Sequence, residues 1–74
     1  MEKEIKQYPV IGGLYKHYKG GVYEFITMST HSETNEPLVI YKSMHFGSVY
    51  ARPLSMWFDE IDLGTHKVNR FTLI

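Results

Sequence analysis

Two segments rich in β-branched and aromatic residues constrain the fold more than any other feature of the sequence. Residues 22–29 read Val-Tyr-Glu-Phe-Ile-Thr-Met-Ser, and residues 38–45 read Leu-Val-Ile-Tyr-Lys-Ser-Met-His. Such residues favour strands, and the Gly20-Gly21 pair before the first segment can supply the positive φ angles of a tight hairpin. The polar stretch from Thr30 to Pro37 predicts a loop. We therefore predict two strands in the middle of the chain.

Four shorter segments predict further strands on either side of this pair. They are residues 14–18, 48–52, 61–63 and 69–74. Short strands with brief connections are typical of small barrels and bent antiparallel sheets, and closure of a sheet removes its free edges. We predict a mostly β fold, as a small SH3-like barrel or a strongly bent antiparallel sheet of five to six short strands.

Residues 53–58 interrupt the strand pattern with helical spacing. Pro53 has no amide hydrogen to give to a strand ladder, and proline suits the first position of a helix. One turn of helix would place Leu54 and Phe58 on the same side. We expect this short helical turn to cover one end of the β structure.

The chain divides into a polar lead-in, residues 1–11, and a single β domain, residues 12–74. A helix could form over residues 2–7, but it is too short to be stable alone. A domain of 74 residues buries little apolar area against the entropy that folding costs. Its six Tyr, four Phe and one Trp supply large buried area with few torsions to freeze. We therefore expect tight packing of large side chains, or self-association.

Charge and composition exclude several classes of function. Eight Lys and Arg residues balance eight Asp and Glu residues, so the chain has no general attraction for nucleic-acid phosphates, which argues against DNA as a partner. There is no cysteine, hence no disulfide and no thiolate ligand for a metal. No apolar run has the length of a signal peptide core or a membrane span. We predict a cytoplasmic protein with no membrane partner and no cofactor.

The two central segments lack a clearly polar face. Strict alternation along residues 22–29 would put Tyr23 and Phe25 on one face and Ile26 and Met28 on the other. One face can form the core, and the other then needs a cover, which could be a second subunit or a ligand. We infer a homo-oligomer or a ligand groove, of which the homo-oligomer is the simpler explanation.

The segment before the glycine pair at 20–21 offers a binding surface. Tyr15 and His17 would share one strand face, where they could stack on a planar ring and hydrogen-bond its edge. Lys16 and Tyr18 would point to the other side. The alternative is a packed edge strand with solvated lysines.

Arg52 is a candidate anion ligand because it lies at a strand end, next to a rigid proline. Its planar guanidinium group could bind a phosphate or a carboxylate through two parallel hydrogen bonds. It could equally form a structural ion pair with Glu24, Glu33 or Asp59. The sequence does not separate these readings.

The loop around His31 carries residue types that occur in metal and hydrolytic sites. His31, Glu33 and Glu36 could converge there, but none of the four histidines has the short paired spacing of zinc ligands. His31-Ser32-Glu33 contains the residue types of a hydrolytic triad, yet such triads are assembled in space rather than from neighbours. We favour a capped, hydrogen-bonded turn, with no metal and no catalytic residue.

Several of these residues also form a recognisable set of motifs. They are Gly13–Gly20, His31–Thr34 with Glu36, Tyr41, Arg52–Met56 and Arg70-Phe71. The set resembles a small bacterial and phage-borne family, domain-of-unknown-function family 1653, over about residues 12–74. Trp57 stands where the family tends to have Phe, and Asn69 where it tends to have Pro.

The resemblance implies a compact β fold and no settled activity. It singles out polar motif positions, and polar loop residues of that kind indicate a site more than core residues do. The positions are Tyr15, His17, Tyr18, Lys19, His31, Glu33, Thr34, Arg52 and Arg70.

The leading hypothesis is a non-enzymatic module that binds a small, planar, anionic ligand, such as a nucleotide or a nucleotide-derived signal, as a homo-oligomer. Tyr15 and His17 would contact the ring. Arg52, with Lys19 or Arg70, would hold the phosphate. His31 and Thr34 would close the rim of the site. Small phage proteins that sequester nucleotide signals from host defence offer an analogy at the level of physical plan.

Two alternatives belong to other classes. An SH3-like interaction module would use its aromatic face to hold a protein or RNA segment, although zero net charge argues against RNA. A small hydrolase would use His31 and Glu33, without an evident nucleophile or metal set. An enzyme is therefore the less favoured interpretation.

Overall fold

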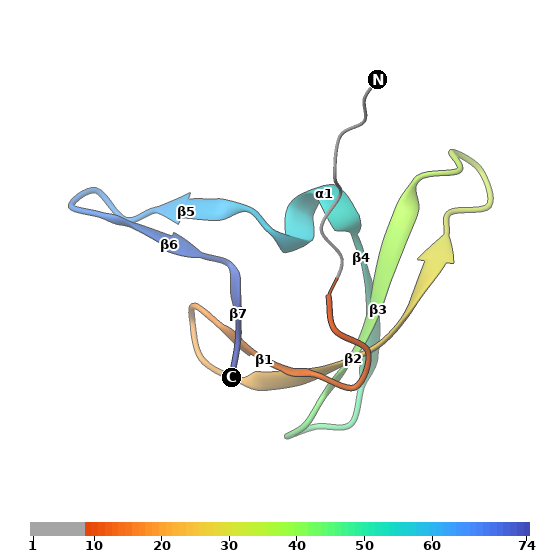
Figure 1. Cartoon of the computed structure of the whole chain (residues 1–74), viewed down its shortest axis with the longest axis horizontal. Helices are drawn as coiled ribbons and strands as arrows, with labels where there is room; N and C mark the ends of the chain where they lie inside the picture. Colours follow the sequence, from red (N-terminus) through yellow and green to blue (C-terminus); the bar gives the residue numbers. More distant parts are fainter. Residues whose placement is uncertain (1–8) are drawn as a thin grey trace.

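The computed structural model describes residues 9–74, so the helix considered over residues 2–7 lies outside the described residues. The elements in chain order are β1 (Leu14–His17), β2 (Val22–Thr30), β3 (Pro37–Ser43), β4 (Val49–Pro53), α1 (Leu54–Trp57), β5 (Glu60–Asp62), β6 (Lys67–Asn69) and β7 (Phe71–Leu73). Five strands form one sheet in the order β4-β3-β2-β1-β7, and β5 and β6 form a separate hairpin (Figure 1). All pairs are antiparallel.

The prediction of a mostly β fold is confirmed. Of the two predicted forms, the structure shows the strongly bent antiparallel sheet. The sheet does not close into a barrel, because β4 and β7 remain its two edges among the described residues. The described residues hold seven strands rather than five or six, because the last predicted strand divides at Arg70. Residues before Arg70 pair with β5, and residues after it pair with β1.

A β-bulge in β2 corrects the predicted alternation of side chains. The pairing of β2 with β3 shifts between Phe25 and Thr27, so Ile26 is the extra residue. Met28 therefore lies opposite Val39 and packs against the core, on the same face as Phe25. Strict alternation is wrong from residue 26 onward, because a bulge inserts one residue and reverses the order of faces.

The core lies on one side of the sheet, which we call the inner face. Its buried residues are Tyr15, Phe25, Val39, Tyr41, Trp57 and Phe71. Trp57 of α1 stacks on Phe71 with ring centroids 3.8 Å apart and planes 8° apart. It also meets Tyr15 and Tyr41 edge-on, at 5.3 and 5.1 Å. The helical turn is thus confirmed as a cover.

The residue that does the covering differs from the one expected. Trp57 is fully buried, whereas Phe58 is 39% exposed and Leu54 is partly buried at the edge of the core. A four-residue helix places one large side chain over the sheet, and Trp57 is the largest of the fully buried side chains. With four residues, α1 is also far too short to cross a bilayer, and no other helix occurs in residues 9–74.

The predicted turns are present. Gly20 and Gly21 have φ angles of 104° and 86° at the end of the β1–β2 hairpin, as the glycine pair indicated. The loop from His31 to Glu36 joins β2 to β3. Because β2 has nine residues, it separates these two turns by about 30 Å.

Candidate functional site

Four of the predicted site residues, His17, Lys19, Arg52 and Arg70, interact through their charges, and we call them the cationic cluster. Partial burial is the main cause that lowers the pKa of His17, and the charges of Arg52, Arg70 and Lys19 lower it further. His17 and Arg52 both lie against the Phe71 ring, at 5.0 and 5.6 Å from its centroid. Such an arrangement creates a positive potential at this end of the core.

Arg52 is held by an aromatic hydroxyl rather than by a carboxylate. Its Nε donates a hydrogen bond to the Tyr41 Oη at 3.1 Å, and its Cζ lies 5.6 Å from the centroid of the Phe71 ring. Of the two readings of Arg52, the structural ion pair with Glu24, Glu33 or Asp59 is not formed within residues 9–74. The guanidinium group lies next to the aromatic surface of Phe71.

Arg70 occupies the corner between β6 and β7. Its backbone N–H donates to the Asp59 carbonyl at 2.8 Å, and its own carbonyl accepts from the Tyr18 N–H at 2.9 Å. Its side-chain Nη2 lies 3.5 Å from Asp59 Oδ2, a weak contact in which Asp59 is 42% exposed. The Nε of Arg70 is buried and has no hydrogen-bond acceptor among the described residues. A buried donor without an acceptor is uncommon in proteins, and Trp57 Nε1 is another among the described residues.

His17 lies between the cations and the aromatic rings. Its Nδ1 accepts the Lys19 backbone N–H at 3.1 Å, so the neutral ring carries its proton on Nε2. Its ring meets Phe71 edge-on at 5.0 Å and Tyr23 at 6.4 Å. The neutral imidazole therefore offers a hydrogen-bond donor without adding a fourth charge.

Tyr15 and Tyr18 have different surroundings from each other. Tyr15 is only 5% exposed, and its Oη accepts the Val10 N–H at 2.7 Å, so its ring supports the core rather than offering a free face. Tyr18 remains partly exposed beside the His17 ring at 4.8 Å. The Lys19 Nζ lies 5.8 Å from the Tyr18 ring centroid. Tyr18 thus borders the cationic cluster.

His31, Glu33 and Thr34 lie in the β2–β3 loop, at the far end of β2 from Lys19 (Figure 1). The Nδ1 of His31 accepts the backbone N–H groups of Glu33 and Thr34 at 3.1 and 3.4 Å. The Thr34 Oγ1 bonds Glu36. These contacts form the capped turn that the sequence favoured.

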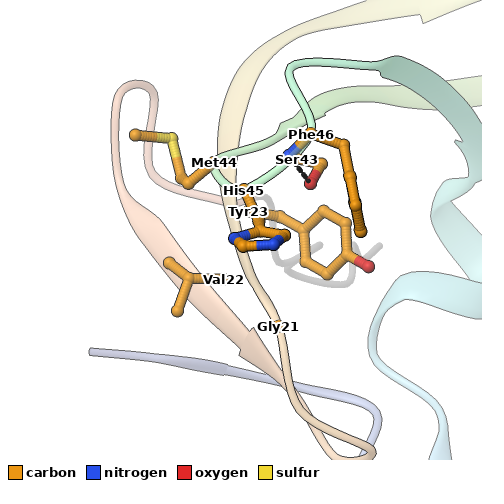
Figure 2. Close-up of a pocket in the computed structure, with 7 residues that line it drawn as sticks. All are labelled: Gly21, Val22, Tyr23, Ser43, Met44, His45 and Phe46. Carbon is orange, nitrogen blue, oxygen red and sulfur yellow. Dashed lines mark hydrogen bonds between the residues drawn. The ribbon is translucent and has the colours of Figure 1, made fainter.

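A groove that sequence reasoning missed adjoins the inner face. It has a volume of about 540 Å³ and is lined by residues of the β1–β2 and β3–β4 turns (Figure 2). The lining residues are Gly21, Val22, Tyr23, Ser43, Met44, His45 and Phe46. The signal in the sequence was the presence of two large apolar residues, Met44 and Phe46, directly before Gly47, where a solvated turn would carry polar residues. In residues 9–74, no three His, Asp or Glu side chains are grouped to hold a metal ion.

Comparisons with known proteins find relatives of this sequence and of its fold. A family model described as "Protein of unknown function (DUF1653)" matches residues 13–73. A crystal structure of a DUF1653 protein from Bordetella bronchiseptica is similar, with a TM-score of 0.77 and 28% sequence identity. The similarity covers 88% of this chain and 87% of that one. A search of curated proteins finds no match.

Proposed function

This chain belongs to the DUF1653 family of proteins of unknown function, and we propose that it is a non-enzymatic module that binds a small, planar, anionic ligand of the nucleotide class. The observation that carries the proposal is the cationic cluster beside aromatic rings. His17 meets the Phe71 ring edge-on at 5.0 Å, and the Arg52 Cζ lies 5.6 Å from the centroid of the same ring. The charges of Arg52, Arg70 and Lys19 all lower the pKa of His17, after burial, and within residues 9–74 the Asp59 carboxylate contacts Arg70. Excess positive charge at a partly dry surface favours an anion.

The donors of the cluster suit a phosphate. Arg52 is anchored through Nε, which leaves its two terminal nitrogens to form a bidentate pair with phosphate oxygens. The Arg70 guanidinium adds a second positive charge, and its buried Nε lacks an acceptor among the described residues. The Nε2–H of His17 adds a neutral donor. Together these groups could hold one phosphate or diphosphate group.

The proposal assigns binding to fewer residues than the sequence predicted. The anion contacts the cationic cluster, and Tyr18 borders it. Tyr15 supports the core beneath, and the His31 loop stabilises the β2–β3 connection. Sequestration of a nucleotide signal by a homo-oligomer is the biological role that we propose for such binding.

A thermal-shift panel tests the proposal. The panel contains 3′,5′-cyclic AMP, cyclic di-AMP, ADP-ribose and inorganic pyrophosphate. A ligand at one hundred times its Kd should stabilise the fold by roughly 2.7 kcal/mol, which raises the Tm of so small a domain by about 10 °C or more. Arg52→Ala should abolish the shift, whereas Lys67→Ala, which removes an exposed cation on β6, should keep it. No shift with any compound would contradict the proposal.

A second candidate, an SH3-like interaction module, is favoured by one observation. A groove of about 330 Å³ runs between β1, β7 and the β5–β6 hairpin. Its lining is mainly apolar, including Leu63, Val68 and Ile74, with Lys16 among the lining residues. A protein partner that co-purifies at one-to-one stoichiometry and is lost in Val68→Asp would favour this candidate over nucleotide binding.

A further inference from the structure

The groove shown in Figure 2 is built from two turns that lie side by side. Met44 N–H donates to the Val22 carbonyl at 2.9 Å, which joins the β3–β4 turn to the start of β2. Ser43 is buried, and its Oγ accepts the Phe46 N–H at 3.0 Å. Gly47 N–H donates to the Ser43 carbonyl at 2.8 Å. The turn is therefore fixed by hydrogen bonds in the free protein.

This fixed turn presents aromatic rings to solvent. Phe46 is 78% exposed, although it is a large apolar side chain on an ordered turn. His45 meets Phe46 edge-on at a centroid distance of 4.6 Å. Figure 2 shows the side chains of His45, Phe46 and Tyr23 around the groove. A preformed, aromatic hollow of about 540 Å³ is within the size range of small-molecule sites.

Tyr23 links this groove to the cationic cluster. Its ring lines the groove and also lies 6.4 Å from the His17 ring and 5.8 Å from the Phe71 ring. Arg52 lies over the same Phe71 ring. The rings of Tyr23 and Phe71 thus lie between the aromatic groove and the cationic cluster. A molecule with a flat ring at one end and an anionic group at the other matches this arrangement.

We propose that the groove lined by Tyr23, His45 and Phe46 holds the heteroaromatic ring of a nucleotide whose phosphates bind the cationic cluster. This inference rests on the proposed function and deepens it, because it assigns the ring its own subsite. Phe46 stacks on the ring, and His45 hydrogen-bonds its edge. Aromatic faces bind bases by stacking with little dependence on base identity, so the subsite selects for a ring rather than for one base.

Isothermal titration calorimetry with ADP-ribose and with inorganic pyrophosphate tests the subsite. Wild type should bind ADP-ribose at least about tenfold more tightly than pyrophosphate, because only ADP-ribose has a ring to stack. Phe46→Ala should weaken ADP-ribose about tenfold and leave pyrophosphate unchanged. The matched control is Phe58→Ala, which removes another exposed phenyl ring, away from the groove, and should change neither affinity. Because Phe46 is so exposed, its loss should leave the fold intact.

Proton NMR gives an independent reading of the same subsite. The Hε1 resonance of His45 should shift on addition of ADP-ribose, through the ring current of the adenine, and should not shift with pyrophosphate. Equal affinity for the two compounds, or unchanged ADP-ribose affinity in Phe46→Ala, would overturn the ring subsite while leaving the anion site. A dimer that dissociates in Phe46→Ala, with ADP-ribose affinity unchanged, would assign the groove to a second copy instead. Binding of neither compound would overturn the proposed function itself.

Discussion

At the scale of single residues, Arg52 and Arg70 differ in what holds each guanidinium group. Arg52 is fixed through Nε by the Tyr41 hydroxyl, and its terminal nitrogens make no ion pair within residues 9–74. The Nη2 atom of Arg70 lies 3.5 Å from Asp59 Oδ2, and its Nε has no acceptor among the described residues. Arg52 is therefore the better placed of the two to bind an incoming anion directly.

Tyr41 should act as a positioning residue for Arg52. In Tyr41→Phe the acceptor of the Arg52 Nε is lost, at a cost of about 1 kcal/mol, so ADP-ribose affinity should fall roughly fivefold. Calorimetry measures the affinity, and chemical denaturation measures the stability. Tyr50→Phe is the matched control, because the Tyr50 hydroxyl makes no hydrogen bond among the described residues. An unchanged affinity in Tyr41→Phe would show that Arg52 needs no such anchor.

His17 should make the stability of the fold depend on pH. Its pKa is lowered in the folded state, so the unfolded chain takes up the proton first as the pH falls. The contribution of neutral His17 is complete above the unfolded pKa, near 6.5, and is lost as the pH falls through the lower folded value. Denaturation curves between pH 7.5 and 4.5 should show a steeper loss in wild type than in His17→Gln. Equal slopes would contradict the prediction.

Anion binding should act on His17 in the opposite direction. A phosphate group near Arg52, Arg70 and Lys19 would screen the charges that depress the pKa of His17, so that pKa should rise on addition of pyrophosphate. An NMR titration of the His17 Hε1 proton, with and without pyrophosphate, measures the change. A pKa that stays constant while pyrophosphate binds elsewhere on the surface would place the anion away from the cluster.

The sequence predicted Arg52 and His17 as site candidates but not the different roles of Tyr15 and Tyr23. Alternation places Tyr15 and His17 on one strand face without saying how deep each lies. Tyr15 is buried because Trp57, more than forty positions later in the chain, packs against it. A contact at that separation leaves no trace in local residue patterns, so the burial of Tyr15 was not predictable.

At the scale of elements, local signals predicted the strands and turns well. Features that depend on long-range strand pairing were predicted poorly. The glycine pair and the polar loop appear where expected, because the φ preferences of such residues act locally. The bulge at Ile26 and the division of the last strand at Arg70 have no comparable signal. Both are set by the partner strands, since β6 pairs with β5 and β7 pairs with β1.

The β1–β2 turn should depend on the positive φ of Gly20. Its φ of 104° is one that L-residues rarely adopt, and a Cβ there would meet no atom within 4 Å. Gly20→Ala should therefore destabilise the fold by backbone strain alone, by roughly 1–2 kcal/mol. Gly20→Asn should cost less, because Asn tolerates positive φ. Chemical denaturation compares the two, and equal costs would mean that the loss is not one of backbone conformation.

The helical turn should contribute to stability through Trp57. Trp57→Ala removes a fully buried ring stacked on Phe71, at a cost of about 3–5 kcal/mol, which is a large part of the stability of so small a domain. Trp57→Phe should cost less and remain folded. Met56→Ala is the control, because Met56 lies on the same helix and is 40% exposed. Urea unfolding followed by far-UV circular dichroism measures all three, and a small effect of Trp57→Ala would contradict the role of α1 as a cover.

At the scale of the whole molecule, the structure is more extended than a compact domain of the same length. Its radius of gyration is 13.2 Å, whereas a compact domain of this length has about 11 Å. Large apolar side chains are exposed on several elements, among them Val49, Leu73 and Ile74. An open shape with exposed apolar groups indicates that a single copy leaves part of its apolar surface in contact with water.

Self-association should follow from that surface. We expect light scattering coupled to size-exclusion chromatography to give a mass at least twice the 8.7 kDa of one chain. The apparent mass should fall toward that of one chain on dilution if the contact is weak. A mass of 8.7 kDa at every concentration would exclude the homo-oligomer and leave the ligand site as the explanation for the exposed groups.

The pairing of β7 with β1 also sets an order of events in folding. The β1–β2, β2–β3 and β3–β4 ladders join neighbours in the chain, but Tyr15 pairs with Leu73. Hairpins form in microseconds, whereas contacts between such distant positions must first overcome the entropy of closing a long loop. Since Arg70 and Phe71 reach His17 only through this last ladder, the end of the molecule that holds the proposed anion site should be the slowest part to assemble during refolding.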